Sequence, residues 1–337
     1  MKILYLSCHS ILEYDEIKLL TELGHEVFSM GTYHNPGKID DPKRPVLDIP
    51  YYPELEKLAT PDNKKNINPK LIAWADVIIC MHIVDWIAEN WEKMKGKRVI
   101  WRAIGQSTLE IETLLRPLRR QGLEIVRYSP LEKTIPGFQG QDALIRFYKD
   151  PDEFKGWTGE KKEVITVGQD LQQRWASSNW NVMDKVFKTL PAHCYGPHNE
   201  PTGHYNAGCP DYEGLKDVLR KNRVFFYTGT APASYTLGFI EAMMTGIPIV
   251  AIGPELGNSP EFAYQKTYEV PEIIKNGVNG FFADDIDTLI KYCRDLLDDD
   301  KLAAKISEAG RKTAIEYFGK KEIKIQWNDY LTKPKRG

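Results

Sequence analysis

The sequence predicts an α/β protein of two domains, each built around a parallel β-sheet. Short apolar runs alternate with amphipathic, helix-like segments along most of the chain, which is the pattern of repeated strand–helix–strand units. Several runs, such as residues 75–81 (ADVIICM), are almost continuously apolar, which indicates strands buried on both faces. The length of 337 residues fits two domains of about 100–200 residues each.

The first domain is predicted to span residues 1–150. Its helix at residues 13–23 has apolar side chains on one face and stops at Gly24, which tolerates the positive φ of a helix end. A second helix contains the segment LLRPLRRQG, and residues 31–70, rich in Pro, Asp and Lys, are predicted to form an irregular insertion. The strands of this domain are predicted at residues 2–7, 25–31, 75–81, 97–101 and 123–128.

A second series of alternating segments begins near residue 162, after a polar linker at residues 151–161. Its strands are predicted at residues 163–168, 193–196, 223–227 and 248–252. Its helices are predicted at residues 180–190, 212–221 and 237–245. Strands that alternate with helices imply right-handed crossovers, so both halves are predicted to be Rossmann-like.

Composition excludes several classes of protein. Lys and Arg number 45 and Asp and Glu 47, and this net charge of −2 argues against broad non-specific binding of nucleic acid. No apolar run approaches the roughly 18 residues of a membrane-spanning helix, and the start MKILYLSCHS lacks the build of a signal peptide. Five cysteines without a CxxC pair do not suggest a disulfide framework, so we expect a cytoplasmic, reduced protein.

One loop has the features of an anion site. Ligands of open parallel sheets bind at the carboxyl ends of the strands. No GxGxxG follows the first strand and no GxxxxGK[ST] occurs, which disfavours a nicotinamide dehydrogenase and a P-loop kinase. The loop TGTAPASYT at residues 228–236, in contrast, precedes the helix predicted at 237–245, and the free N–H groups of that helix start suit a diphosphate. The alternative is an ordinary capped helix.

The last third of the chain carries recognisable motifs. Residues 241–243 (EAM) and 246–250 (GIPIV), followed by 270–274 (VPEII) and 276–281 (NGVNGF), resemble the C-terminal domain of retaining GT-B glycosyltransferases of the GT4-like kind. The first half resembles the same family more loosely. The resemblance implies two Rossmann-like domains facing across a cleft, with the acceptor on residues 1–150 and the donor on 162–315. It also implies that a final helix within 316–337 packs back on the first domain.

The same resemblance implies the reaction. A sugar would pass from a nucleoside diphosphate donor, with UDP-sugar the commonest guess, to an acceptor hydroxyl, with retention and without a metal or other cofactor. No DxD motif stands where a metal-dependent transferase would need it. The acceptor is expected to be a saccharide or small molecule. Two alternatives stay open: a catalytically weak or inactive GT-B protein that binds nucleotide or sugar, and a transferase acting on a nucleic-acid base. A GT-B epimerase ranks last.

Individual residues follow from the matched motifs. Glu241 is expected to bind the nucleotide ribose, Arg174 to neutralise the departing diphosphate, and His82, after the strand at 75–81, to lie near the sugar and acceptor. The other donor residues implied are Gly168, Gln169, Tyr235, Thr236 and Leu237. The loop Tyr195, Gly196 and Pro197 is expected near the base, and Glu13, Tyr14, Arg102 and Gln106 near the acceptor.

The sequence departs from the family's pattern at two donor positions. Ala233 stands where the first Glu of the family's E-x7-E motif is usual, and Gln169 stands where an Arg is usual. These departures support the alternative of a weak or inactive protein.

Three other groups invite a functional interpretation. His193, Cys194, His198, His204 and Cys209 could form a zinc site, but their spacing is irregular and a polar loop is preferred. A phosphate-bearing acceptor or a solvated helix face would both explain the basic group of Arg116, Arg119, Arg120 and Arg127. Residues 257–267 resemble an insertion that could form a lid or contact the acceptor.

Overall fold

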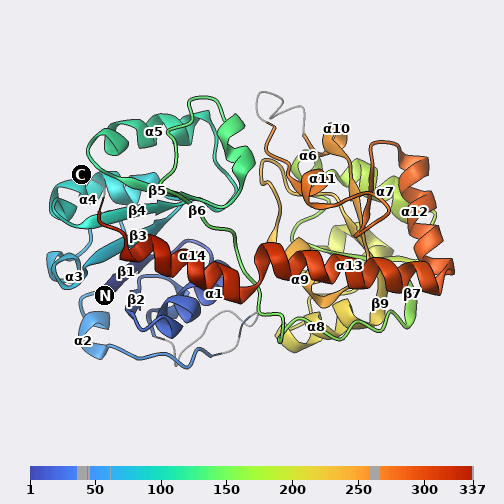
Figure 1. The fold of residues 1–337 in the computed structure, drawn as a ribbon, viewed down its shortest axis with the longest axis horizontal. Coiled ribbons are helices and arrows are strands. Elements are labelled where there is room, and N and C mark those ends of the chain that lie inside the picture. The colour runs from blue at the N-terminus through green and yellow to red at the C-terminus, as the bar shows by residue number, and fades with distance from the viewer. Residues whose placement is uncertain (36–43, 45, 61, 259–265, 336–337) are drawn as a thin grey trace. The chain divides into compact units, whose positions relative to one another are not determined.

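The computed structural model describes residues 1–35, 44, 46–60, 62–258 and 266–335. The chain forms two compact units (Figure 1). Unit 1 comprises Met1–Phe147 together with Lys321–Gly337, and unit 2 comprises Tyr148–Lys320. The first domain is therefore discontinuous in sequence, because the C-terminal segment belongs to the same unit as the N-terminal half. Most of the 257–267 segment lies outside the described residues.

Unit 1 is built on a six-stranded parallel sheet with the order β2-β1-β3-β4-β5-β6. All five predicted strands are confirmed. The sixth was not predicted, because a strand of two residues has no periodicity to read. The strands are β1 (Lys2–Leu6), β2 (Glu26–Ser29), β3 (Val77–Met81), β4 (Arg98–Arg102), β5 (Glu124–Arg127) and β6 (Ala143–Leu144).

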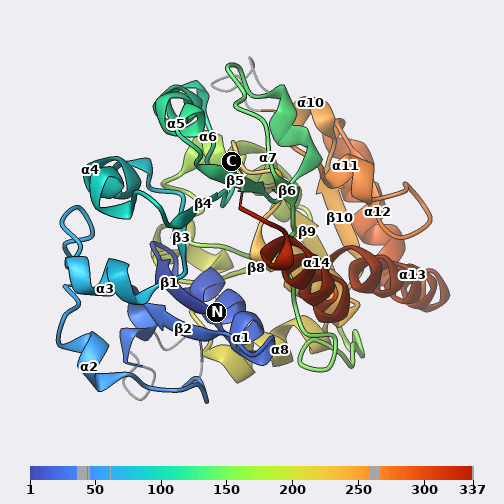
Figure 2. The ribbon, with the colours of Figure 1, turned by 60° about the vertical axis from the view of Figure 1, so that its left-hand side comes forward.

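Helices cover both faces of this sheet: Figure 2 shows α4 and α5 on one face and α1 and α14 on the other. α1 begins three residues before its predicted start, because the side chain of His9 caps it by accepting from the N–H of Leu12. Short helices also occur within the segment predicted to be irregular. The helices are α1 (Ser10–Glu22), α2 (Pro53–Glu56), α3 (Pro69–Trp74), α4 (Val84–Met94), α5 (Leu109–Arg120) and α14 (Lys320–Thr332), with 3₁₀ turns η1 (Thr32–His34) and η2 (Pro130–Thr134).

Helix α14 is held in unit 1 by both apolar packing and an arginine. Trp327 is fully buried. The Arg98 guanidinium, paired with Glu124 at 2.8 Å, donates to the last carbonyls of the helix, those of Tyr330 and Leu331, at 3.1 and 2.9 Å. A cation near the C-terminus of a helix is favourable because it compensates the helix dipole.

Unit 2 is built on a five-stranded parallel sheet with the order β11-β10-β9-β7-β8. The predicted helices at 212–221 and 237–245 agree with the structure to the residue, whereas the one at 180–190 ends at Phe187. The strands are β7 (Lys161–Val167), β8 (Ala192–Tyr195), β9 (Asn222–Tyr227), β10 (Ile249–Ile252) and β11 (Phe281–Ala283). The helices are α6 (Trp175–Ser178), α7 (Trp180–Phe187), α8 (Tyr212–Lys221), α9 (Leu237–Thr245), α10 (Pro254–Gly257), α11 (Val270–Ile273), α12 (Ile286–Asp298) and α13 (Asp300–Phe318), with the 3₁₀ turn η3 (Glu200–Tyr205).

The two sheets share one topology, and it positions a ligand site in each. The strand order reverses between β1 and β3 in unit 1 and between β7 and β9 in unit 2. At such a reversal the neighbouring crossovers leave toward opposite sides, and the carboxyl ends of the two central strands border an open crevice. The candidate ligand-binding residues are therefore those that follow β1 and β3 in unit 1, and those that follow β7 and β9 in unit 2.

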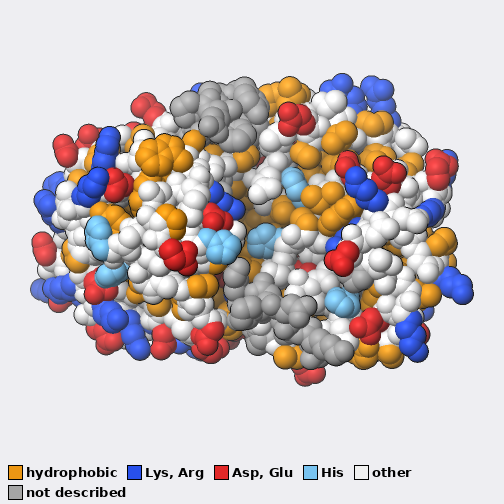
Figure 3. All heavy atoms as spheres, turned by 180° about the vertical axis from the view of Figure 1, so that it is seen from behind, with side chains coloured by type: hydrophobic (Ala, Val, Ile, Leu, Met, Phe, Trp, Pro, Cys, Tyr) orange, Lys and Arg blue, Asp and Glu red, His pale blue; other side chains and the backbone are white. Residues whose placement is uncertain are grey.

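The surface carries charges of both signs. On the face shown in Figure 3, basic and acidic side chains are intermixed over the two units, which agrees with the formal net charge of −2. Among the residues that the structure describes, no helix has the length and apolar character needed to cross a membrane.

Candidate functional site

The loops after β7 and β8 are joined at the carboxyl edge of the second sheet. The Gly168 N–H donates to the Tyr195 carbonyl at 3.0 Å. Gly196 has a φ of 127°, and a Cβ there would lie 2.2 Å from the Gly168 oxygen, so only glycine fits. The amide of the fully buried Asn199 donates to the Gly168 carbonyl at 2.8 Å and accepts from the Leu171 N–H at 3.0 Å. Sequence reasoning missed Asn199, which locks these loops together.

The loop after β9 is tied to the same framework. The Thr228 hydroxyl donates to the Ser178 carbonyl at 2.7 Å, and the Asn179 amide donates to the Thr228 carbonyl at 3.0 Å. The Ala231 N–H donates to the Ser177 carbonyl at 2.8 Å. The segments that follow β7, β8 and β9 therefore form one hydrogen-bonded rim, as a site preorganised at the β7/β9 reversal requires.

The N-terminus of α9 faces this rim. Thr236 caps the helix by accepting from the Phe239 N–H at 3.4 Å, and its own N–H donates to the Tyr227 hydroxyl at 3.0 Å. The N–H groups of Leu237 and Gly238 lie in the first turn, where a helix offers no partner. A Cβ on Gly238 would lie 3.6 Å from the carbonyl of Val167, the last residue of β7, so this helix start lies against the end of β7. The geometry suits a bound anion.

Two polar side chains of the loop that follows β7 are exposed. Gln169 donates to its neighbour Asp170 at 2.9 Å. Arg174 is also exposed, and none of the hydrogen bonds or ion pairs found among the described residues involves its guanidinium. Its backbone is fixed, because the Arg174 N–H donates to the Asp170 carbonyl at 2.9 Å. An arginine with a fixed backbone and an unoccupied guanidinium can bind an anionic ligand bidentately.

Glu241 lies one turn inside α9, and its surroundings were not foreseen. Its side chain is buried, and Oε1 lies 2.8 Å from the Nζ of Lys149, which is buried as well. Tyr235 is also enclosed, with its ring 5.2 Å from that of Phe318. Sequence reasoning could not find Lys149, because nothing local to residue 149 indicates that its partner lies in α9.

The loop predicted to meet the nucleotide base adjoins the same rim. Tyr195 and Pro197 are half-buried, and the Pro197 carbonyl accepts from the Asp170 N–H at 3.2 Å. Burial raises the pKa of the Tyr195 hydroxyl, so the phenol is neutral at pH 7 and can donate a hydrogen bond. The structure thus brings the predicted base loop beside the predicted phosphate residues, all within unit 2.

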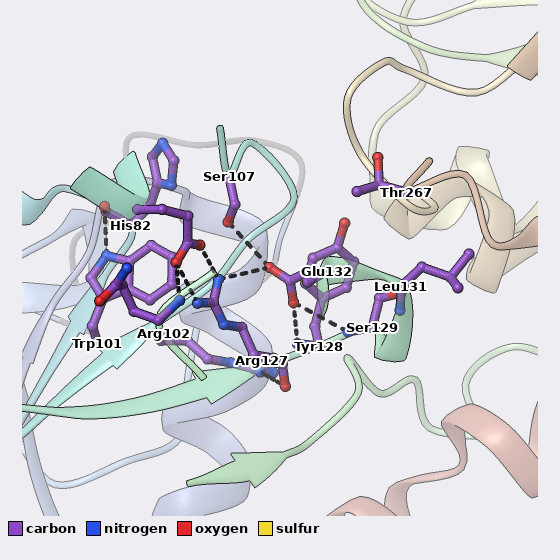
Figure 4. Close-up of polar contacts among 12 residues, drawn as sticks. His82, Trp101, Arg102, Ser107, Arg127, Tyr128, Ser129, Leu131, Glu132 and Thr267 are labelled. Atoms are coloured by element: carbon purple, nitrogen blue, oxygen red, sulfur yellow. Dashed lines mark hydrogen bonds and ion pairs between the residues drawn. The ribbon is translucent and has the colours of Figure 1, made fainter. Parts of the chain in front are cut away.

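In unit 1, His82 stands at the carboxyl end of β3, at the β1/β3 reversal. Its φ is 59°, and its backbone is held by hydrogen bonds with the Arg102 carbonyl and the Trp101 indole, at 2.9 and 2.7 Å (Figure 4). The side chain is 8% exposed, and Nδ1 has no partner among the described residues. Burial lowers the pKa of the imidazole, so it is neutral at pH 7. A buried, unpaired ring nitrogen in a strained residue is typical of a functional site.

Two residues predicted to meet the acceptor are enclosed within unit 1. The Glu13 carboxylate accepts from the Ser29 hydroxyl at 2.6 Å and from the Tyr33 N–H at 2.8 Å. Gly31 leaves room for it, because a Cβ there would lie 2.2 Å from Glu13 Oε2. Burial raises the pKa of Glu13. The Tyr14 ring packs 5.7 Å from that of Tyr33. These contacts hold the loop after β2.

The other two predicted acceptor residues differ from each other. Arg102 is fully buried, with Nε 2.7 Å from Glu16 and Nη1 2.6 Å from the Ile145 carbonyl. Gln106 is exposed in the loop after β4. Of the four predicted acceptor residues, Gln106 therefore has the side chain that reaches solvent, and the contacts of Arg102 are structural.

The basic group proposed for a phosphate-bearing acceptor is not one surface, which corrects that interpretation. Arg127 is fully buried and binds Glu112 bidentately at 2.6 and 2.9 Å, with Glu132 at 3.7 Å (Figure 4). Arg119 pairs with Asp142, and only Arg116 and Arg120 of the group are exposed. The local sequence cannot show this, because the carboxylates that bury Arg127 come from other elements.

The residues considered for zinc are dispersed. His198 lies 3.3 Å from Asp170, while Cys194 is buried in β8 and Cys209 is exposed. Within the described ranges, no group of three or more His, Cys, Asp or Glu side chains could hold a metal ion.

Comparison with known proteins identifies the architecture. No family model matches the sequence, and no curated protein matches it. Among solved structures, HepE from Anabaena in complex with UDP-glucose matches with a TM-score of 0.70 and 16% identity, covering 98% of this chain and 99% of that one. Sucrose-phosphate synthase from Thermosynechococcus elongatus matches with a TM-score of 0.67 and 14% identity, covering 98% of both chains.

A glycosyltransferase from Rickettsia africae matches with a TM-score of 0.65 and 14% identity, over 99% of both chains. The matches extend over nearly the whole of each chain and include both parallel-sheet units. The chain therefore has the GT-B architecture that these glycosyltransferases share, which confirms the fold expected from the sequence.

Proposed function

We propose that this protein is a glycosyltransferase that moves a sugar from a nucleoside diphosphate donor to an acceptor hydroxyl. The observation that carries the proposal is the start of α9, seated against the end of β7 at the β7/β9 reversal, where Leu237 and Gly238 offer their N–H groups. HepE, which shares the fold, is known in complex with UDP-glucose, and this supports a UDP-sugar as donor.

The donor residues have distinct tasks in this proposal. The first turn of α9 binds the diphosphate, and Arg174 neutralises its charge as it leaves. The bond between the sugar C1 and the diphosphate oxygen breaks, a bond from C1 to the acceptor oxygen forms, and the hydroxyl proton leaves with the diphosphate. Glu241 accepts hydrogen bonds from the ribose. The motif resemblance supports retention of configuration, and the α9 and Arg174 arrangement supplies the charge stabilisation without a metal or other cofactor.

The acceptor is assigned to unit 1, at the β1/β3 reversal beside His82. A neutral imidazole can accept a hydrogen bond from a sugar or acceptor hydroxyl. Arg127 is buried and paired with Glu112, and Arg119 pairs with Asp142, so these arginines do not form the exposed basic surface that a nucleic acid would need. A saccharide or other small molecule is therefore the favoured acceptor.

A second candidate function is a GT-B protein that binds the nucleotide or sugar without turnover. The observation in its favour is Ala233, which is half-buried in the loop after β9 and has no carboxylate to offer a donor sugar. Turnover separates the two candidates, because release of free UDP from a UDP-sugar requires catalysis and binding alone does not produce it.

Thermal unfolding with a ligand panel tests the donor assignment. The panel contains UDP, GDP, ADP, their glucose and mannose conjugates, and NAD. A ligand at about 100 times its dissociation constant stabilises the folded state by roughly 2.7 kcal/mol, so we expect a clear rise in Tm with one nucleoside diphosphate, UDP in the first place. NAD is the matched control, since it also carries a diphosphate. A rise with NAD alone, or with none of the nucleoside diphosphates, would contradict the proposal.

His82→Asn is expected to lower transfer by about tenfold or more while UDP affinity stays within about twofold. Asparagine tolerates the positive φ of this position, so the change removes the imidazole with little cost in backbone strain. Transfer is measured with the donor that the panel identifies, and UDP binding by calorimetry. His25→Asn is the control, because it makes the same change beside β2, at the amino edge of the sheet. Unaltered turnover in His82→Asn would remove this residue from the site.

A further inference from the structure

A buried ion pair links the start of unit 2 to the candidate ribose carboxylate. Lys149 follows the point where the chain enters unit 2, and its Nζ lies 2.8 Å from Oε1 of Glu241. The two side chains are 2% and 5% exposed. A buried charge is costly without a partner, so the loss of either side chain would leave the other buried without its counter-charge.

Lys149 is held in place from several sides. Its backbone N–H donates to the Phe318 carbonyl at 3.0 Å, and its ammonium lies 5.6 Å from the centre of the buried Phe154 ring. Arg311, from α13, fixes the surrounding segment by donating to the carbonyls of Phe154 and Pro151 at 2.5 and 2.7 Å and to a carbonyl near the end of α9. The lysine therefore presents its charge to α9 from a fixed position.

We propose that Lys149 is a positioning residue, which holds Glu241 ionised and oriented so that the site selects ribonucleoside over 2′-deoxyribonucleoside diphosphates. This inference rests on the proposed function, in which Glu241 receives the ribose. An ionised carboxylate has about four acceptor positions, so it can accept from Lys149 and from two vicinal hydroxyls at the same time. A neutral carboxylic acid would present a donor in place of one acceptor, and its bonds to the hydroxyls would be weaker.

A purely structural role for the pair makes a different prediction. If Lys149 only ties the start of unit 2 to α9, its loss lowers the stability of the protein. It then weakens the binding of ribonucleotides and of 2′-deoxyribonucleotides by the same factor. The ratio of the two dissociation constants is then unchanged. If Lys149 orients Glu241 for the ribose, the loss of Lys149 lowers the ratio of the 2′-deoxy to the ribose dissociation constant, because the 2′-hydroxyl is the group that distinguishes the two ligands.

The experiment measures the dissociation constants of UDP, GDP and ADP, each beside its 2′-deoxy form, by calorimetry. In the unmodified protein we expect the 2′-deoxy form of the preferred nucleotide to bind about tenfold or more weakly, as for loss of a hydrogen bond to a charged group. Lys149→Met and Lys149→Gln should bring that ratio to within about twofold of unity, as should Glu241→Gln. Thermal unfolding verifies that each variant is folded. If Lys149→Met does not fold, the dissociation constants measured with Lys149→Gln decide the test.

Lys320→Met is the matched control. Lys320 pairs with Asp150 at 3.2 Å where the chain leaves unit 2, so the change removes a lysine from a neighbouring, more exposed ion pair without touching Glu241. The ratio of 2′-deoxy to ribose dissociation constants in Lys320→Met should equal that of the unmodified protein. The role of Lys149 would be overturned if both Lys149 variants kept the unmodified protein's ratio of 2′-deoxy to ribose dissociation constants while Glu241→Gln brought that ratio close to unity. The proposed function would then remain intact. A ratio near unity in the unmodified protein would overturn the ribose assignment, and the role of Lys149 with it.

Discussion

Arg174→Ala should lower the rate of sugar transfer by about a hundredfold or more, the loss typical when one preorganised group that stabilises developing charge is removed. The guanidinium is exposed at the carboxyl edge of the second sheet, on a backbone fixed by the Asp170 carbonyl. In the proposed reaction, negative charge grows on the departing diphosphate, and a cation there stabilises the transition state more than the ground state. Steady-state kinetics with the donor identified by the ligand panel measure the effect.

Binding measurements show whether Arg174 acts on phosphate. Arg174→Ala should weaken the binding of UDP by about tenfold or more, because a charge-assisted hydrogen bond to the diphosphate is lost. The affinity for uridine, which has no phosphate, should change little. Arg174→Lys should retain part of the affinity, since it keeps the charge but not the bidentate geometry. Arg116→Ala, the same change at an exposed arginine of α5, is the control. Equal losses for UDP and uridine would refute the phosphate role.

Arg127→Met is expected to lower the free energy of unfolding by about 3–5 kcal/mol, because it leaves the carboxylate of Glu112 buried without its counter-charge. Both side chains are fully buried, and the pair is bidentate. The guanidinium also lies 5.3 Å from the centre of the Trp101 ring. Glu132, 3.7 Å away, has a pKa raised by burial despite the opposing effect of Arg127, so loss of the arginine should raise that pKa further.

Chemical denaturation of three variants separates the pair from the general loss of an arginine. Arg120→Met makes the same change at an exposed position near the end of α5 and should alter stability by less than about 0.5 kcal/mol. The double variant Arg127→Met with Glu112→Met should recover much of the loss, because no unpaired charge remains. If the double variant is no more stable than Arg127→Met alone, uncompensated burial of Glu112 is not the cause.

The strands and several helices could be predicted because their signals are local. β3 is apolar at each of its five positions, and α9 is bounded by a capping Thr236 and by Gly246, whose φ is 97°. β6 could not be predicted, because two residues become a strand only by pairing with β5. α1 begins earlier than predicted because its cap is the side chain of His9, an unusual capping residue.

The candidate site divides in the same way. The small-residue loop before α9 and the motif around Glu241 are visible in the sequence, and they predicted where an anion and a ribose would bind. The partners of these groups are not visible there. Lys149 reaches Glu241, and Asn199 joins the loops after β7 and β8, only once distant segments have folded together.

By itself, the sequence determined the alternation of strands and helices, the parallel character of both sheets, and the loop that leads into α9. Apolar periodicity, caps and glycines encode these features within a few residues. Tertiary structure alone decided which charged side chains are enclosed, as Arg102 and Arg127 are, and which remain exposed, as Arg174 does. The reason is physical: whether a charge can be buried depends on a counter-charge and hydrogen-bond partners that distant parts of the chain supply.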